Sequence, residues 1–171
     1  MRNVLSREDI LILIQRDPPL VRDYINLVEQ LQPNGFDLTL RDVALFQSGG
    51  AIGISNSQRV ISVVAPLAFD NQGWLELPPG SYLITFNEIV NVPKNIMALG
   101  APRSSLLRCG VTVHMAVWDA GYSGRSQSLM VVYNPGNFRV QKNARIAQLV
   151  FFELGQETTG YNGTYQGENI H

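Results

Sequence analysis

The feature of this chain that most constrains its fold is a change in residue pattern at Gln32. Beyond this residue, short runs of β-branched, aromatic and aliphatic residues alternate with glycine, proline and asparagine. Such runs at near-regular spacing predict an all-β sandwich or barrel, and the Gly- and Ser-rich stretch Ser48–Asn56 predicts a surface loop. The predicted strands are Phe36–Leu40, Gln58–Val64, Gly73–Leu77, Ser81–Asn87, Ile96–Gly100, Val111–Val117, Leu129–Asn134, Phe138–Val140 and Arg145–Glu153.

The residues before Gln32 instead have a pattern typical of helices. Ser6 and Asp9 have the spacing of a capping box, and Asp17-Pro18-Pro19 predicts the end of that helix. A second helical turn is predicted within Val21–Gln30, because apolar residues recur there at helical spacing. We therefore expect one domain, residues 1–171, with a helical extension over 1–31 and a polar C-terminal segment over 155–171.

Composition excludes several classes of protein. The chain has 171 residues, of which 45% are hydrophobic and 16% charged, and these values predict a compact globular chain. A net charge of −1 predicts no bulk attraction to nucleic acid or anionic lipid. No apolar run approaches the ~18 residues of a membrane span, and no signal-peptide layout is present. We expect a cytoplasmic protein that binds neither nucleic acid nor membrane.

The segment Pro102–Arg108 predicts a short helix with Ser104 or Ser105 near its N-cap. The planar guanidinium of Arg103 and the adjacent hydroxyls suit phosphate oxygens. The alternative is a plain capped turn with a surface arginine, and the pattern is too short to decide between them.

A second segment places Asp119, Gly121 and Tyr122 after an apolar strand. Asp and Gly are ordinary turn residues, so a simple β-turn is one interpretation. The other is that Asp119 accepts a proton from water at the rim of a polyphosphate pocket, where a divalent cation offsets the phosphate charge. Tyr122 could then pack against a sugar.

A third segment, Arg145–Leu149, carries a neutral amide inside an apolar run. Strict alternation would place Gln148 on the same face as Ile146 and Val150. A buried glutamine needs hydrogen-bond partners, which are either backbone groups or a ligand.

Histidine and cysteine are scarce. His114 and His171 are the only histidines and Cys109 is the only cysteine, which excludes a multi-histidine or cysteine-built metal site. A core histidine is the simpler interpretation of His114 than a catalytic one, and a Ser-His-Asp triad is not supported.

Four segments resemble, in order and spacing, the four motifs of the dUTPase and dCTP deaminase superfamily. They are Gln32–Leu38, Pro102–Gly110, Trp118–Gly124 and Asn143–Leu149. The helical start near Ser6 resembles the deaminase branch and archaeal relatives. The resemblance covers nearly the whole chain. It implies a distorted jelly-roll-like, dUTPase-like β-barrel with a short N-terminal helix, a Mg²⁺-dependent reaction on a deoxynucleoside triphosphate, and a homotrimer with active sites shared between subunits.

Two chemistries use this scaffold, and one residue separates them. Family deaminases carry a proton-shuttling glutamate on the strand after the third motif. Pairing that strand on Tyr133-Asn134 places Val131 at its position, and Ala120–Gly136 contains no acidic residue. The resemblance therefore favours a dUTP diphosphatase, which hydrolyses dUTP to dUMP and pyrophosphate. The alternatives are a dCTP deaminase or bifunctional deaminase/dUTPase, and a non-catalytic nucleotide-binding β module.

By resemblance, Asp119 activates the water that attacks the α-phosphate. Asp37 either acts through Mg²⁺-bound water or braces the site. The segment 155–171 forms a lid, in which Thr164 stands where related lids have a lysine for the terminal phosphate. The implied nucleotide-binding residues are Arg103, Ser104, Ser105, Arg108, His114, Met115, Tyr122, Gln148, Tyr161 and Gln166.

Overall fold

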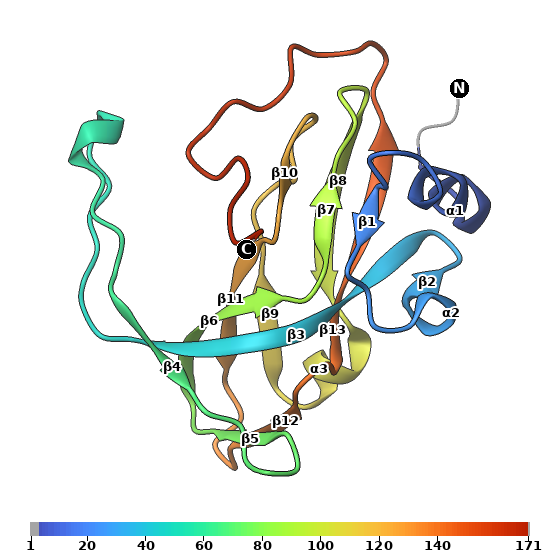
Figure 1. Ribbon diagram of the computed structural model, residues 1–171. Coiled ribbons are helices and arrows are strands. Elements are labelled where there is room, and N and C mark those ends of the chain that lie inside the picture. Colours follow the sequence, from blue (N-terminus) through green and yellow to red (C-terminus); the bar gives the residue numbers. More distant parts are fainter. Residues whose placement is uncertain (1–3, 171) are drawn as a thin grey trace.

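The computed structural model describes residues 4–170 and has a nearly closed, six-stranded antiparallel barrel at its centre (Figure 1). Going round the barrel, the strands are β8 (Ile96–Pro102), β13 (Arg145–Glu153), β3 (Gly35–Phe46), β6 (Gly80–Phe86), β11 (Gln127–Val132) and β9 (Val111–His114). The first and last strands approach one another where Ala98 of β8 bridges to Trp118, just beyond β9. The predicted β-barrel with a short N-terminal helix is confirmed.

The remaining strands are short. β2 (Leu31–Gln32) and β4 (Val64–Leu67) pair with β3, and β5 (Trp74–Leu77) pairs with β12 (Phe138–Gln141). A separate three-stranded sheet has the order β1 (Val21–Arg22), β7 (Ile89–Asn91), β10 (Ser123–Gly124). The sequence did not predict β1, β2, β7 or β10, because strands of two or three residues carry no detectable alternation.

Alternating side chains from the barrel strands fill its interior. Phe36, Phe86 and Phe151 are fully buried, and the core continues through Leu38, Ile84, Met130 and Leu149. The predicted span of β13 is confirmed, but a register shift between Arg145 and Ala147 breaks its alternation. Ile146 and Ala147 are both buried as a result, and Gln148 lies on the half-buried outer side. The expectation that Gln148 shares the face of Ile146 is therefore wrong.

The N-terminal residues form one regular helix and one turn. Helix α1 (Arg7–Ile14) begins at Ser6 with the predicted capping box, in which Ser6 Oγ accepts from Asp9 N at 3.2 Å and Asp9 Oδ2 accepts from Ser6 N at 3.1 Å. The second helical turn predicted within Val21–Gln30 is confirmed as α2 (Leu27–Gln30), which Asn26 caps. Val21 and Arg22 pair with β7 instead of joining this turn.

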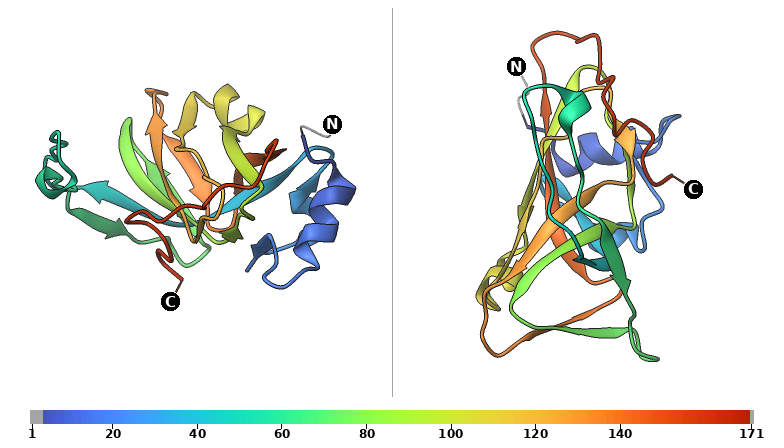
Figure 2. Two further views of the ribbon diagram at one scale, coloured as in Figure 1. Left: turned by 90° about the horizontal axis from the view of Figure 1, so that it is seen from above. Right: turned by 90° about the vertical axis from the view of Figure 1, so that its left-hand side faces the viewer.

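An arm, residues 47–63, projects from the barrel between β3 and β4 (Figures 1 and 2). Figure 2 places it on the opposite side of the barrel from α1 and α2. A bridge between Ala51 and Val60 closes it, and its tip is the 3-10 helix η1 (Asn56–Gln58). Ser48–Asn56 is exposed, as predicted. The strand predicted at Gln58–Val64 is wrong, because residues 58–63 lie in the arm and β4 begins only at Val64.

Within residues 4–170, no helix combines the length and apolar character needed to cross a membrane.

Candidate functional site

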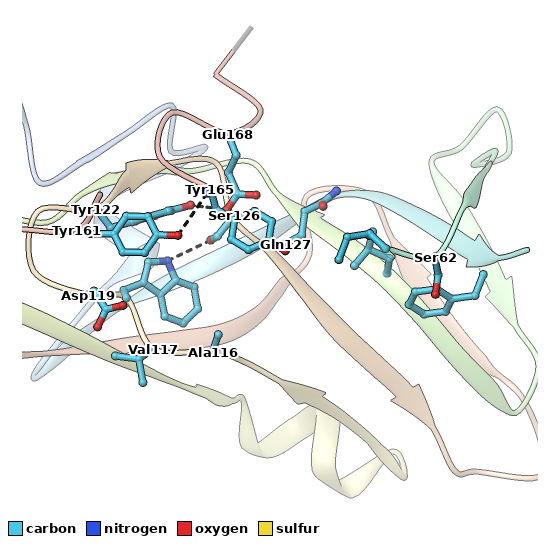
Figure 3. Close-up of a pocket in the computed structure, with 14 residues that line it drawn as sticks. Ser62, Ala116, Val117, Asp119, Tyr122, Ser126, Gln127, Tyr161, Tyr165 and Glu168 are labelled. Atoms are coloured by element: carbon cyan, nitrogen blue, oxygen red, sulfur yellow. Dashed lines mark hydrogen bonds between the residues drawn. The ribbon is translucent and has the colours of Figure 1, made fainter. Parts of the chain in front are cut away.

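A cavity of about 390 Å³ lies on the outside of the barrel, between the loop after β9, the base of the arm and the C-terminal segment, residues 155–170 (Figure 3). Its lining is mainly aromatic and aliphatic, with a few polar groups. The lining residues are Phe46, Ile61, Ser62, Leu83, Ala116, Val117, Trp118, Asp119, Tyr122, Ser126, Gln127, Tyr161, Tyr165 and Glu168.

Asp119 owes its place at the cavity to its buried neighbour, Trp118. The Trp118 backbone exchanges hydrogen bonds with Ala98, at 3.0 and 2.9 Å, and its indole Nε1 donates to Ser126 Oγ at 3.1 Å. Strand β9 ends at His114 rather than at the predicted Val117, and the chain crosses to β8 before reaching Asp119. The Asp119 carboxylate is consequently exposed at the cavity on a fixed backbone.

The residues after Asp119 form the predicted tight turn. Tyr122 N donates to Asp119 O at 3.0 Å, and Gly121 has a positive φ of 85°. A Cβ at Gly121 would lie 2.7 Å from Gly160 Cα, so this turn allows the C-terminal segment to approach closely. Asp119 thus lies in a turn and also faces the cavity, so the turn does not exclude the functional interpretation.

Tyr122 is buried, with 7% of its surface exposed. Its hydroxyl donates to Glu168 Oε1 at 2.8 Å, and its ring meets Tyr161 edge-on with centroids 5.9 Å apart. Burial is the main cause that raises the pKa of the Tyr122 hydroxyl, and the Glu168 charge raises it further. Burial also raises the pKa of Glu168 above its usual range, although the bond from Tyr122 opposes this.

The C-terminal segment is anchored beside the Asp119 turn. Tyr161 N donates to Ala120 O at 2.7 Å, and Gly167 N donates to Ser123 O at 2.7 Å. The Gln166 side chain accepts from Ser123 N and donates to Gly121 O, each at 3.0 Å. Tyr161 therefore lines the cavity, whereas the side chain of Gln166 is occupied by backbone groups.

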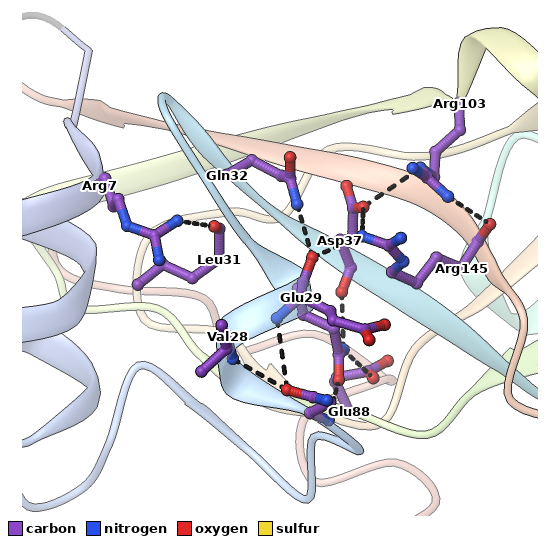
Figure 4. A network of polar contacts seen from close by, with 11 residues as sticks. Arg7, Val28, Glu29, Leu31, Gln32, Asp37, Glu88, Arg103 and Arg145 are labelled. Atoms are coloured by element: carbon purple, nitrogen blue, oxygen red, sulfur yellow. Dashed lines mark hydrogen bonds and ion pairs between the residues drawn. The ribbon is translucent and has the colours of Figure 1, made fainter.

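A second group of predicted residues surrounds α3 (Ser104–Arg108). Arg103 is the N-cap of this helix, and no side chain caps it. Arg103 Nε instead pairs with Asp37 Oδ2 at 3.2 Å, and Arg145 pairs with the same oxygen at 3.4 Å (Figure 4). Asp37 is only 2% exposed, and burial raises its pKa even though both arginines act to lower it.

A network of buried hydrogen bonds centred on Glu88 lies next to Asp37 (Figure 4). Glu88 has no exposed surface and accepts hydrogen bonds from Gln30 Nε2 at 2.7 Å, Thr39 N at 2.9 Å and Thr39 Oγ1 at 2.6 Å. Gln30 also donates to Asp37 O at 2.8 Å. Burial raises the pKa of Glu88, and these hydrogen bonds oppose the rise. The network ties the N-terminal extension to the strand that carries Asp37.

The two groups lie at opposite ends of β9. Helix α3 precedes this strand and Asp119 follows it, and four residues of strand alone span roughly 13 Å. The residues that line the cavity include no lysine or arginine. Ser105 and Arg145 instead line a separate hollow of about 280 Å³. The structure brings Asp119, Tyr122 and Tyr161 together, and it does not bring Arg103, Ser104, Ser105, Arg108 or Gln148 to them.

His114 and Met115 lie between the two groups. The His114 side chain is exposed on the outer side of β9, so its interpretation as a core histidine is wrong. Met115 is half-buried beside Gly100, where an added Cβ would collide with it.

The acidic side chains of the described residues are dispersed. Among residues 4–170, no cluster of three or more His, Cys, Asp or Glu side chains could hold an ion. Asp119 and Glu168 are the only carboxylates that line the described cavity. Mg²⁺ commonly keeps several waters and binds through one or two carboxylates plus substrate phosphates. Asp119 and Glu168 therefore fit a Mg²⁺ ion that is bound together with substrate phosphates.

Three features of these sites were not predicted from the sequence. They are the carboxylate of Glu168, the buried carboxylate of Glu88, and the ion pair of Arg145 with Asp37. Glu168 is the only acidic residue of 160–170, and that isolation beside two tyrosines was the available signal. No local pattern marks Glu88, whose partners lie 49 and 58 residues away along the chain.

Comparisons with known proteins extend over almost the whole chain. The family described as dCTP deaminase-like matches residues 4–154. A "Probable deoxyuridine 5'-triphosphate nucleotidohydrolase" of Methanosarcina mazei is 48% identical, covering 98% of this chain and 99% of the relative. A protein of Archaeoglobus fulgidus with the same name is 47% identical, covering 98% of each chain.

A solved structure shares the fold. It is the 2'-deoxycytidine 5'-triphosphate deaminase of Agrobacterium tumefaciens, with a TM-score of 0.66 and 19% identity. The match covers 89% of this chain but only 48% of that one, so the present chain spans about half the length of that protein.

Proposed function

The chain belongs to the dCTP deaminase-like family, and from that premise we propose that it is a dUTP diphosphatase. It hydrolyses dUTP to dUMP and pyrophosphate, which removes dUTP from the DNA precursor pool and yields dUMP. The observation that carries this proposal is the exposed carboxylate of Asp119 at a cavity it shares with the buried aromatic Tyr122. Two relatives that match nearly end to end carry names for the same activity.

Hydrolysis is favoured over deamination because the chain lacks a proton shuttle for the cytosine ring. By resemblance, Val131 stands where family deaminases have the glutamate; it lies on β11 opposite Thr112 and Ser81. Valine cannot transfer a proton, and residues 120–136 contain no acid in any alternative register.

Asp119 is proposed to orient a water molecule and take its proton as the water attacks the α-phosphate. Positioned bases of this kind contribute roughly 100- to 10,000-fold to rates. The Tyr122 ring packs on the deoxyribose, where a ribose 2'-hydroxyl would collide with it. The backbone of β9 near His114 and Met115 reads the base. Mg²⁺, when bound with the nucleotide, offsets phosphate charge and favours attack at phosphorus.

The phosphates are proposed to be held by a neighbouring subunit of a homotrimer. A triphosphate needs cations, and none lines the cavity that contains Asp119. The arginines and hydroxyls near α3 lie at the other end of β9, with Ser104, Ser105 and Arg108 exposed. An assembly with shared sites would place one chain's α3 group over the next chain's Asp119. The residues proposed for this grip are Arg103, Ser104, Ser105, Arg108 and Gln148.

Asp37 is proposed to brace the site. Its carboxylate is already paired with Arg103 and Arg145, which supports bracing over contact with Mg²⁺-bound water. Tyr161 and Gln166 belong to the C-terminal segment, which is proposed to act as the lid.

One assay separates the candidate functions. The protein is incubated with dUTP or dCTP and Mg²⁺ in heavy-oxygen water, and the products are resolved. We expect dUMP and pyrophosphate from dUTP, with the heavy oxygen in dUMP. Uracil nucleotides formed from dCTP would contradict the exclusion based on Val131, and no turnover of either substrate would favour a nucleotide-binding module.

A further inference from the structure

Tyr122 contacts residues of the C-terminal segment, which is distant from it in the sequence. Its hydroxyl donates to Glu168 across 46 residues of sequence, and its ring contacts Tyr161 of the same C-terminal segment. With 7% of its surface exposed, Tyr122 is enclosed by this segment (Figure 3). Contacts with this segment therefore help to orient the ring in the structure.

The position of Glu168 is itself fixed by backbone bonds on both sides. Gly167 N donates to Ser123 O at 2.7 Å, and Arg125 N donates to Glu168 O at 2.9 Å. Residues 167 and 168 thus lie along β10 like an added strand. One residue further on, the Asn169 side chain donates to Arg125 O at 3.1 Å.

Arg125 secures this docking from the barrel side. It is 6% exposed, and its guanidinium donates to Asn169 O at 3.0 Å and pairs with Asp23 at 2.9 Å. A buried, paired arginine holds a fixed geometry, so the Glu168 carboxylate reaches Tyr122 from a defined point.

We propose that Glu168 is a positioning residue that holds the Tyr122 ring against the nucleotide sugar. The site therefore rejects ribonucleotides only when the C-terminal segment is docked. This inference rests on the proposed function, in which Tyr122 packs on the deoxyribose. An undocked segment leaves the ring free to turn, and a free ring tolerates a 2'-hydroxyl. Substrate selection is therefore completed only in the closed site.

Glu168 has a second conceivable role, because it is a carboxylate in the same cavity as Asp119. A base or metal ligand requires the negative charge, whereas positioning requires only an acceptor oxygen at the right place. Glutamine keeps that oxygen and removes the charge. Glu168→Gln and Glu168→Ala therefore separate the two roles.

The experiment measures kcat and KM for dUTP and for UTP, with Mg²⁺, on the full chain and its variants. For Glu168→Ala we expect the ratio of kcat/KM for dUTP over UTP to fall about tenfold, the effect of losing the one hydrogen bond that Tyr122 donates. Glu168→Gln should stay within about twofold of the parent, since its amide oxygen still accepts from Tyr122. Tyr122→Phe should resemble Glu168→Ala, and the double variant should be no worse than either single one.

Glu157→Ala is the matched control, because Glu157 is an exposed glutamate of the same segment outside the cavity lining. An unchanged dUTP/UTP ratio in Glu168→Ala would overturn the inference while leaving dUTP hydrolysis in place. A loss of kcat in Glu168→Gln as large as in Glu168→Ala would also overturn it, in favour of a role for the charge. Absence of dUTP turnover in the parent protein would instead overturn the proposed function itself.

Discussion

Asp119 and Arg103 lie beyond opposite ends of β9, and only Asp119 faces the cavity that also contains Tyr122. The strand between them is short but extended, so bending it to join the two groups would break its pairing with β11. A single chain therefore has two separate groups of candidate site residues, one with a carboxylate and aromatic rings, the other with arginines and hydroxyls. This separation is the physical reason for proposing that subunits share their active sites.

Replacing Asp119 with asparagine should remove the base and little else. We expect kcat for dUTP to fall ~100- to 10,000-fold, while affinity for a non-hydrolysable dUTP analogue changes no more than a few-fold. The carboxylate is exposed, so thermal stability should stay within about 0.5 kcal/mol of the parent. Calorimetric titration and steady-state kinetics check this prediction. A near-normal kcat would show that another group activates the water.

Asp37→Asn tests the bracing role. The substitution keeps the shape of the side chain but removes the charge that holds Arg103 and Arg145. We expect KM for dUTP to rise severalfold with a smaller change in kcat. The free energy of unfolding should fall by about 1–2 kcal/mol, and not by more, because the two arginines that lose their partner remain partly solvated.

Asp42→Asn is the control for this change, since Asp42 also pairs with an arginine, Arg41, but at the surface. It should cost under about 0.5 kcal/mol and leave KM unchanged. Equal effects of the two substitutions on KM would argue against a specific brace at Asp37.

Glu88 should give the fold a defined pH dependence. Burial raises its folded-state pKa above the ordinary 4.5, so at rising pH the unfolded chain releases this proton before the folded chain does. The contribution of Glu88 to the free energy of unfolding is thus complete below the ordinary pKa and declines as pH rises through the raised one. Glu88→Gln does not titrate, so the stability of the parent relative to this variant should fall over that window.

Denaturant unfolding at several pH values measures this difference. Asp37 and Glu168, whose pKa values are also raised, are present in both proteins and cancel in the comparison. Glu157→Gln is the surface control and should track the parent. Parallel stability curves for the parent and Glu88→Gln would contradict the assignment.

Local chemistry in the sequence predicted the parts of the fold that depend on neighbouring residues. The capping box of Ser6 and Asp9 and the span Arg145–Glu153 are both confirmed, since each follows from spacing within one element. The turn at Asp119 was predictable for the same reason. The order of the motifs also located the carboxylate that faces the cavity.

Features that depend on distant residues could not be predicted. The register shift near Arg145 arises from pairing with β3, and it reverses the expected face of Gln148. The residues predicted as a strand at Gln58–Val64 have the right composition, but most lie in the arm, away from the barrel sheet. Glu168 and Glu88 have partners more than 40 residues away, and apart from the isolation of Glu168 beside two tyrosines no local pattern marks either residue.

The most direct test of the proposed shared site mixes two variants that should each be inactive. Asp119→Asn lacks the proposed base, and Arg103→Gln lacks the arginine proposed to bind phosphate. Chains of the two variants are unfolded together in equal amounts, refolded, and assayed for dUMP release from dUTP, with mixed assemblies isolated through distinct tags. Every mixed cyclic trimer with shared sites has one of its three sites built from an intact Asp119 and an intact Arg103, so we expect the isolated mixed assemblies to have about a third of the parental activity. The proposed shared site would be contradicted if the mixed assemblies were as inactive as the two variants alone, or if size-exclusion chromatography showed a monomer.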